Sequence, residues 1–253
     1  MTTSMADLRN AWGPDDPFVL EALRDSHVQQ LQLIYDSSNY VFVATLEHPE
    51  FGGGLGIYKP RSGEQPLHDF PYGTLHEREI AAYEASEAFG WRLVPPTVER
   101  DGPQGIGSMQ LFIAHDPQQH YFELRKDVAY HEQLIRLAVF DLVMNNADRK
   151  GGHVLLDALG HVWGIDNALC FHHVDKLRTV IWDFAGVEVS EAVRADLGRM
   201  RDCLEARDGS TKALRDWIAE AEVDAIVRRC DALLGHPVLP EMYPWRCVPW
   251  PLL

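Results

Sequence analysis

The apolar positions of the first hundred residues come in short runs separated by turn residues, a pattern typical of β-strands. Two β-branched runs in residues 31–46 flank the turn sequence DSSN, and a third occupies residues 52–60, where a proline stops it. Two more runs, in residues 93–100 and 105–113, are joined by DGPQ. The pattern predicts five strands in this part of the chain.

One helix is predicted between the third and fourth of these strands. A stripe of apolar side chains at helical spacing runs from Leu75 to Phe89. Thr74 is the predicted N-cap, with Glu77 as its capping-box partner, and Gly90 is predicted to end the helix.

The pattern becomes helical after about residue 115. Residues 131–147 are apolar on most sides, as expected of a helix inside a core. The elements predicted after it are a hairpin over residues 153–157 and 161–166, two or three helices over about residues 189–206 and 210–234, and an irregular Pro- and Trp-rich tail over residues 237–253. These features predict an α+β fold with a β-rich lobe, residues 1–114, and a helical lobe, residues 115–253, forming one bilobal unit. A cleft between two lobes is a common place for a small-molecule site.

Composition narrows the classes of function. The chain has 253 residues, of which 46% are apolar, and a net charge of -15. This acidity argues against nucleic-acid binding and against docking on an anionic membrane. No apolar run is long enough for a membrane anchor, and the four cysteines form no C-x-x-C pair. We therefore expect a cytoplasmic protein with reduced thiols.

Three side chains around the predicted hairpin are candidates for chemistry. Asp148 follows the buried helix and could orient or deprotonate a hydroxyl, or simply close a turn. Asp166 ends the second strand and would suit Mg²⁺, which prefers hard oxygen donors. His153 opens the first strand and could ligate a metal or only hydrogen-bond in place. Because Asp148 and Asp166 flank the outer ends of one hairpin, we expect them to lie close together.

The β-rich lobe adds further candidates. Lys59 ends the third strand and could reach phosphate oxygens as a point charge, or simply be solvated. Glu79, on the helix, could hold this lysine, although other glutamates of the helix compete for the role. The turn of residues 36–39, which contains Ser37 and Ser38, could be a plain hairpin turn or could cover a phosphate with successive backbone N–H groups.

In this order, these features resemble the bilobal protein-kinase-like fold in its atypical branch. The sequence DRKGGHVLL resembles the catalytic D-R-x-x-x-N of the phosphatidylinositol 3- and 4-kinase families, with His153 in place of Asn. GIDNALCF resembles their metal-binding segment, with Asn167 in place of Phe, and IYKP and LVPPT are similar to segments of type II phosphatidylinositol 4-kinases. HipA-like kinases share the layout. Most of residues 30–185 resemble an actinobacterial family labelled phosphatidylinositol-kinase-like.

The resemblance implies ATP as cofactor, with Mg²⁺ or Mn²⁺, and a role for each candidate. It implies that Lys59 binds phosphate oxygens, that Glu79 pairs with Lys59, and that Asp148 orients or deprotonates the acceptor hydroxyl. Asp166 and His153 would bind the metal. Residues 110–113, including Gln110 and Phe112, would contact the adenine, and Ser37 and Ser38 would cover the phosphates.

The histidine at position 153 is a departure from the kinase pattern. Imidazole is a poorer ligand for Mg²⁺ than an amide oxygen and a better one for Mn²⁺. Asn145 and Asn146 lie close by and could supply part of the missing amide. Asp141, on the buried helix, is predicted to be structural.

The sequence thus predicts an ATP-dependent phosphotransferase, an atypical kinase, acting on an unidentified hydroxyl acceptor. One alternative is a nucleotide-binding pseudokinase or an AMP-transferring protein. Another is a metal-dependent hydrolase that uses His172, His173 and Asp175. The expected partners are a nucleotide and the acceptor. The tail could mark a surface for a protein partner or fold back onto the helical lobe.

Overall fold

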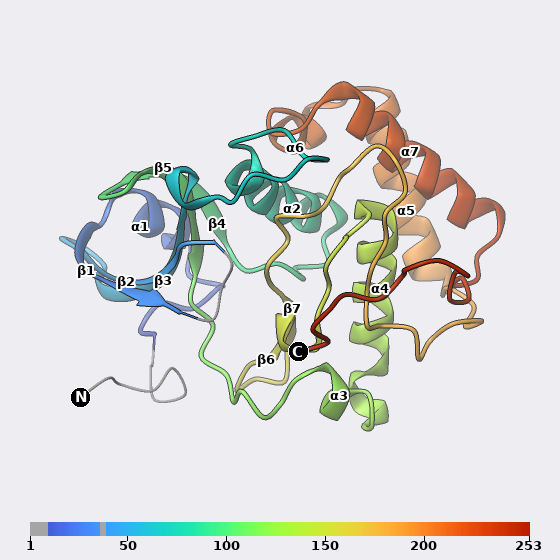
Figure 1. Ribbon diagram of the computed structural model, residues 1–253, viewed down its shortest axis with the longest axis horizontal. Coiled ribbons are helices and arrows are strands. Elements are labelled where there is room, and N and C mark those ends of the chain that lie inside the picture. The colour runs from blue at the N-terminus through green and yellow to red at the C-terminus, as the bar shows by residue number, and fades with distance from the viewer. Residues whose placement is uncertain (1–9, 36–38) are drawn as a thin grey trace.

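The fold combines one antiparallel sheet with a helical half (Figure 1), in a computed structural model that describes residues 10–35 and 39–253. The five-stranded sheet has the order β1-β2-β3-β5-β4, and a separate hairpin pairs β6 with β7. The strands are β1 (His27–Ile34), β2 (Val41–His48), β3 (Gly52–Pro60), β4 (Thr97–Gly102), β5 (Gly105–Leu111), β6 (Val154–Leu156) and β7 (Val162–Gly164). All five strands predicted for the first part of the chain, and the hairpin, are confirmed.

The helices are α1 (Val19–Asp25), α2 (Leu75–Phe89), α3 (Tyr121–Leu124), α4 (His131–Met144), α5 (Glu191–Glu205), α6 (Lys212–Arg215) and α7 (Glu220–Gly235). Helix α1 was not predicted, because seven residues are about two turns, too few to show a helical period. The two or three helices predicted over residues 189–206 and 210–234 are three, α5, α6 and α7. None of the helices in the described residues combines the length and apolarity needed to cross a membrane.

The ends of α2 were predicted in part. Thr74 does precede the first residue of the helix, but its hydroxyl donates to the carbonyl of Pro71 at 2.8 Å and makes no cap hydrogen bond. The predicted capping box between Thr74 and Glu77 is therefore wrong. Gly90 ends the helix as predicted, with a left-handed φ of 73° that glycine adopts without a Cβ clash.

Each half of the chain contributes an element to the core of the other. Helix α2 lies between β3 and β4 in sequence, yet its buried side chains, such as Ala82 and Phe89, belong to the core of the helical lobe. In return, Leu155 and Trp163 of the β6–β7 hairpin pack into the core beneath the sheet. The amide of Gly164 also donates to the carbonyl of a residue between α2 and β4, Leu93, at 2.7 Å. In Figure 1 the hairpin lies between the sheet and the helices.

The tail crosses the helical lobe as irregular chain and ends beside the hairpin (Figure 1). The carbonyl of Cys247 accepts from the amide of Thr179 at 3.0 Å, and the amide of Gly151 donates to the carbonyl of Leu252 at 2.7 Å. The tail therefore folds back onto the lobe, while Trp245 and Trp250 remain 64% and 77% exposed.

A buried ion pair joins α4 to the loop that follows it. The side chains of Asp141 and Arg149 are both fully buried, and Nη2 of Arg149 lies 2.9 Å from Oδ1 of Asp141. The same guanidinium donates to the carbonyl of Ile165 and to Oδ1 of Asn167, the latter at 2.6 Å. One arginine thus fixes the helix, the loop and the end of the hairpin against one another.

We expect Asp141→Leu to lower the free energy of unfolding by about 3–5 kcal/mol, because it leaves the Arg149 charge buried without its counter-ion. The double variant Asp141→Leu, Arg149→Met should lose less than the sum of the two single changes, since no charge is left stranded. Guanidinium chloride unfolding near neutral pH measures both. Glu132→Ala, which breaks an exposed pair with Arg136, is the control and should cost at most about 0.5 kcal/mol. If the double variant loses as much stability as the two single variants together, the pairing is contradicted.

Candidate functional site

A cavity of about 260 Å³ lies between the sheet and the hairpin and holds most of the predicted site residues. Its lining includes the charged or titratable side chains Lys59, Asp148, Lys150, His153 and Asp166. Apolar walls come from Ile34, Val41, Ile57, Leu155 and Ile165, with residues 110–113 along one side. An apolar slot with ionisable groups gathered at one part of its wall is a common form of small-molecule site.

Lys59 lies at the centre of the charges. Its Nζ contacts Oε1 of Glu79 and lies 2.8 Å from Oδ1 of Asp166. Burial alone would lower the pKa of Lys59, but the two carboxylates outweigh it and raise the pKa, so the ammonium stays charged. Oε2 of Glu79 accepts from the amide of Asn167 at 3.1 Å. The sheet, α2 and the hairpin thus meet at one lysine.

The position of Glu79 is fixed by its neighbour on α2. Nη1 of Arg78 donates to the carbonyl of Cys170 at 2.8 Å, and Nη2 contacts Oε1 of Glu222 at 2.6 Å. This arginine is buried and ties α2 both to the segment after the hairpin and to α7. The sequence gives no signal for it, because its partners Cys170 and Glu222 are distant along the chain.

Asp166 sits at the end of β7 in a conformation rare for a residue with a Cβ. Its φ is 58°, in the left-handed region, which the surrounding contacts must hold in place. Burial by itself would raise the pKa of this carboxyl, but the positive charge of Lys59 outweighs that effect and lowers the pKa. The carboxylate remains 43% exposed and charged, open to a cation.

His153 contacts Asp166 directly, with Nε2 at 3.2 Å from Oδ2. Burial lowers the pKa of His153 to about 4, so the imidazole is neutral near pH 7. Nδ1 accepts from the amide of Lys150 at 3.4 Å, which places the proton of the neutral ring on Nε2, the nitrogen next to Asp166. To ligate a metal through Nε2, His153 would have to move this proton to Nδ1.

Asp148 lies in the loop after α4, and its backbone is held by a side chain of the same loop. Its amide donates to Oδ1 of Asn146 at 2.9 Å. Burial raises the pKa of Asp148, and the ammonium of Lys150, 3.3 Å from Oδ2, opposes the rise. Lys150 was not predicted as a site residue, since a lysine in a polar loop carries no periodic or turn signal.

The predicted nucleotide contacts have mixed outcomes. Gln110 and Phe112 line the cavity, but Nε2 of Gln110 donates to Oγ1 of Thr97 at 2.9 Å and is committed within the sheet. Phe112 is buried and packs against the sheet. Ser37 and Ser38 lie outside the described residues.

Neither asparagine near His153 replaces the missing amide. Nδ2 of Asn145 donates to the carbonyls of His172 and Val174, both at 2.8 Å, and its Oδ1 accepts from the amide of Lys176. Asn146 bonds to Asp141 and to the amide of Asp148. Both side chains are buried and occupied in holding the loop, so this expectation is wrong.

The donors around Asp166 fit a divalent cation that is shared with a phosphate ligand. Within residues 10–35 and 39–253, no three His, Cys, Asp or Glu side chains come together as a complete metal site. Mg²⁺ in nucleotide sites is commonly held by one or two carboxylates together with phosphate oxygens and water. Asp166, with Asp148 and His153 nearby, matches that donor set.

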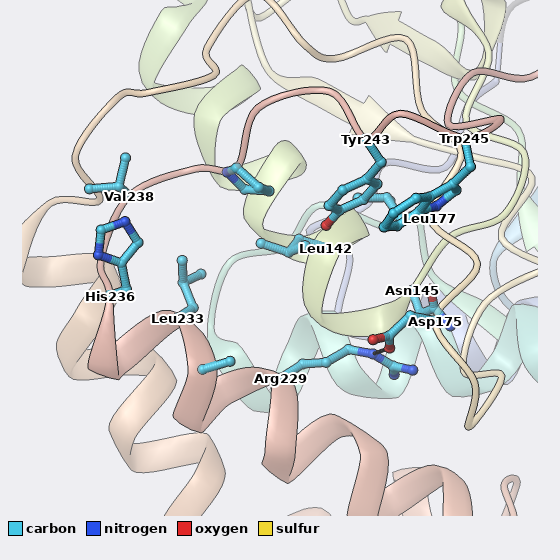
Figure 2. A pocket seen from close by; sticks show the side chains of 12 residues that line it. Leu142, Asn145, Asp175, Leu177, Arg229, Leu233, His236, Val238, Tyr243 and Trp245 are labelled. Atoms are coloured by element: carbon cyan, nitrogen blue, oxygen red, sulfur yellow. Dashed lines mark hydrogen bonds and ion pairs between the residues drawn. The ribbon is translucent and has the colours of Figure 1, made fainter.

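The three residues of the hydrolase alternative, His172, His173 and Asp175, do not form a metal-binding cluster in the described part of the chain. Asp175 pairs with Nε of Arg229 at 2.9 Å, while the rings of His172 and His173 stack on each other with centroids 4.7 Å apart. Asp175 and Arg229 line a second cavity of about 380 Å³, whose other walls are mainly apolar side chains of α4, α7 and the tail (Figure 2). It contains none of the residues predicted to bind a nucleotide.

Comparisons with solved structures show the kinase-like fold. Hydra Fam20, in a structure with sugar, has a TM-score of 0.54 at 16% identity, covering 87% of this chain and 88% of its own. The Golgi casein kinase with Mn/ADP bound has a TM-score of 0.53 at 15% identity, covering 89% and 79%. The predicted α+β bilobal kinase-like fold is confirmed.

Sequence comparisons agree with this fold. The family model for phosphatidylinositol 3- and 4-kinase matches residues 88–204, which include Asp148, His153 and Asp166. Protein Rv2133c of Mycobacterium tuberculosis is 40% identical over 228 residues, covering 77% of this chain and 81% of that protein. At this identity and coverage, the chain belongs to the family of Protein Rv2133c, built on a kinase-like fold.

Proposed function

We propose that the protein is an ATP-dependent phosphotransferase that transfers a phosphoryl group to a hydroxyl acceptor. The observation that carries this proposal is the contact of Lys59 with both Glu79 and Asp166, at the wall of a cavity that Asp148 also lines. A charged lysine held beside a carboxylate that faces a cavity is suited to a phosphate chain and its cation. The kinase-like fold supports the same reading.

In the proposed reaction, each residue of the cavity has a separate task. The adenine lies against the apolar walls and residues 110–113, and Lys59 binds phosphate oxygens of the nucleotide. A divalent cation held at Asp166 would neutralise charge on the phosphates. The acceptor oxygen bonds to the terminal phosphorus as the bond to ADP breaks, and Asp148 orients the hydroxyl and accepts its proton.

The proposed cation is Mn²⁺ in preference to Mg²⁺. A neutral imidazole at His153, next to Asp166, favours a metal that accepts nitrogen ligands. The Golgi casein kinase, a structural neighbour, has Mn/ADP bound. This preference requires His153 to transfer its Nε2 proton to Nδ1 when the cation binds.

Asp166→Asn should weaken metal-dependent ATP binding by about tenfold or more, since even outer-shell changes cost about 10–100-fold in metal affinity. Asp148→Asn should keep the ATP affinity and lower turnover by about 10²–10⁴-fold, the usual contribution of a general base. Calorimetry with ATP and each metal measures the first effect, and ADP release measures the second. Metal-dependent binding without turnover in the wild type would favour the pseudokinase. The proposal is rejected if the ATP affinity is the same with and without the metal and is unchanged in Asp166→Asn.

His153→Asn introduces the amide oxygen that Mg²⁺ prefers. We expect wild-type ATP affinity to be higher with Mn²⁺ and the variant to shift the preference toward Mg²⁺. The matched control is His161→Asn, at the other end of the hairpin, where the ring contacts the carbonyl of Arg92 and not the cavity. Equal or better wild-type binding with Mg²⁺ would count against a ligand role for His153.

Lys150→Gln removes a positive charge that opposes the raised pKa of Asp148. The pKa should rise further, and because only the ionised carboxylate accepts a proton, the acidic limb of the kcat profile should move to higher pH. Lys126→Gln, which breaks an exposed pair with Glu123, should leave the limb in place. A limb that stays fixed in Lys150→Gln would mean that the titrating group is not Asp148.

A further inference from the structure

The second cavity, between α4, α7 and the tail, has no role in the proposed reaction. Its volume of about 380 Å³ is larger than the 260 Å³ of the cavity around Lys59. Most of its wall is apolar and comes from Leu142, Leu177, Ala232, Leu233, Val238, Pro240, Tyr243 and Trp245. Figure 2 shows Arg229 and Asp175 together at one end of the cavity and His236 at the other. An apolar cavity of this size with a few polar groups suits a small molecule.

The hydrogen-bond donors of Arg229 are only partly satisfied. Nε pairs with Oδ1 of Asp175 at 2.9 Å, and Nη2 donates to the carbonyl of His172 at 2.7 Å. Within residues 10–35 and 39–253, Nη1 is buried and has no hydrogen-bond partner. A buried donor without a partner is costly, so an acceptor atom that reached Nη1 would bind favourably.

The charge of Arg229 is also incompletely compensated. The side chain of Arg229 is only 10% exposed, whereas that of Asp175 is 85% exposed and its charge is screened by water. Burial lowers the pKa of Arg229, and the hydrogen bond and charge of Asp175 do not offset this fall. A guanidinium stays protonated in proteins, so the charge persists at this end of the cavity. The balance favours an acidic group on a ligand over a neutral or basic one.

Two aromatic rings indicate the shape of the ligand. The rings of Tyr243 and Trp245 are stacked, with their centroids 4.9 Å apart and their planes 7° apart. Both side chains line the cavity, and the large exposed fraction of Trp245 places it at the rim. Flat aromatic groups pack favourably against such rings in offset or edge-to-face arrangements. A flat apolar body therefore suits this part of the wall.

The cavity adjoins the loop that carries Asp148. Asn145, at the end of α4, lines the cavity, and Oδ1 of the next residue, Asn146, accepts from the amide of Asp148 at 2.9 Å. Leu177 also lines the cavity, and the amide of the next residue, Arg178, donates to the carbonyl of Asn146 at 2.9 Å. Residues that hold the loop therefore directly follow residues of the cavity wall.

The tail makes a third connection between the cavity and the loop. Trp245 lines the cavity, and the carbonyl of Cys247, two residues later, accepts from the amide of Thr179 at 3.0 Å. Thr179 in turn forms a parallel β-bridge with Arg149, the residue after Asp148. A ligand that packs against α4, Leu177 and the tail would thus restrain all three supports of the loop.

We propose that this cavity binds a flat apolar molecule with one acidic group, and that binding orders the loop that carries Asp148. The acidic group meets Arg229, whose long side chain turns to bring Nη1 to it, and the apolar body lies against Tyr243 and Trp245. The molecule would be an effector and not a substrate, because it occupies a site separate from the proposed nucleotide cavity. Its effect would pass through the shared supports of the loop.

Fluorescence titration tests the site with two matched probes, anilinonaphthalene sulfonate and its neutral counterpart phenylnaphthylamine, which both become fluorescent in apolar surroundings. The sulfonate stands in for the acidic group. It should bind at one site about tenfold or more tightly than the neutral probe, as expected for a hydrogen bond between charged groups. Arg229→Gln should abolish this difference and leave the affinity for the neutral probe unchanged, and Arg229→Lys should keep part of it.

Arg228→Gln is the matched control, because Arg228 is an exposed neighbour on α7 that does not line the cavity. Ala232→Trp is a second variant that fills the cavity from an exposed position of its wall, so it should block both probes without disturbing the core. Circular dichroism checks that each variant is folded. The inference is overturned if neither probe binds, if the two probes bind equally, or if the preference survives in Arg229→Gln.

Hydrogen exchange tests the effect on the loop. With the sulfonate probe bound, the amides of residues 145–151 and 177–180 should exchange more slowly, and by a larger factor than those of β2. This protection should be absent in Ala232→Trp. Exchange of the loop that is unchanged by the bound probe would overturn the effector role. Because neither measurement uses a nucleotide, the outcome is independent of whether the protein turns over ATP.

Discussion

The buried pair of Asp141 and Arg149 is the interaction on which the site depends. A fully desolvated guanidinium is costly unless its donors are satisfied, and here they reach a carboxylate of α4, the carbonyl of Ile165 and the side chain of Asn167. Satisfying one cation therefore fixes three segments at once. Asp148 precedes this arginine and Asp166 lies between two of its partners, so the pair determines where both candidate carboxylates point.

The exchange of elements between the two cores provides a second constraint. Helix α2 buries its face in the helical lobe, and the hairpin buries Leu155 and Trp163 under the sheet. The contact between Lys59 and Glu79 is consequently a contact between a strand of one lobe and a helix docked on the other. Arg78 strengthens that docking through α7. A change in the packing of α2 would therefore alter the position of Glu79 and, through it, the position of Lys59.

The charged side chains of the site balance one another. Lys59 contacts two carboxylates, and Nε2 of His153 lies 3.2 Å from Oδ2 of the second, so each oxygen of Asp166 has a nitrogen beside it. The left-handed backbone of Asp166 is maintained by these contacts and by Arg149 on the adjacent residues. A cation entering the cavity must compete with the lysine and the imidazole for the same oxygens.

Local sequence pattern was enough for the elements that depend on neighbours in the chain. Strand alternation, the apolar period of α4 and the glycine that ends α2 follow from backbone geometry and burial within short windows. The motif order around Asp148 and Asp166 also indicated the kinase-like fold and the candidate carboxylates. The tertiary structure alone decided which polar side chains are committed elsewhere: Asn145, Asn146 and Gln110 satisfy buried partners, and Thr74 does not cap its helix. It also revealed Arg78 and Lys150, because the partners of these side chains are brought together only by folding.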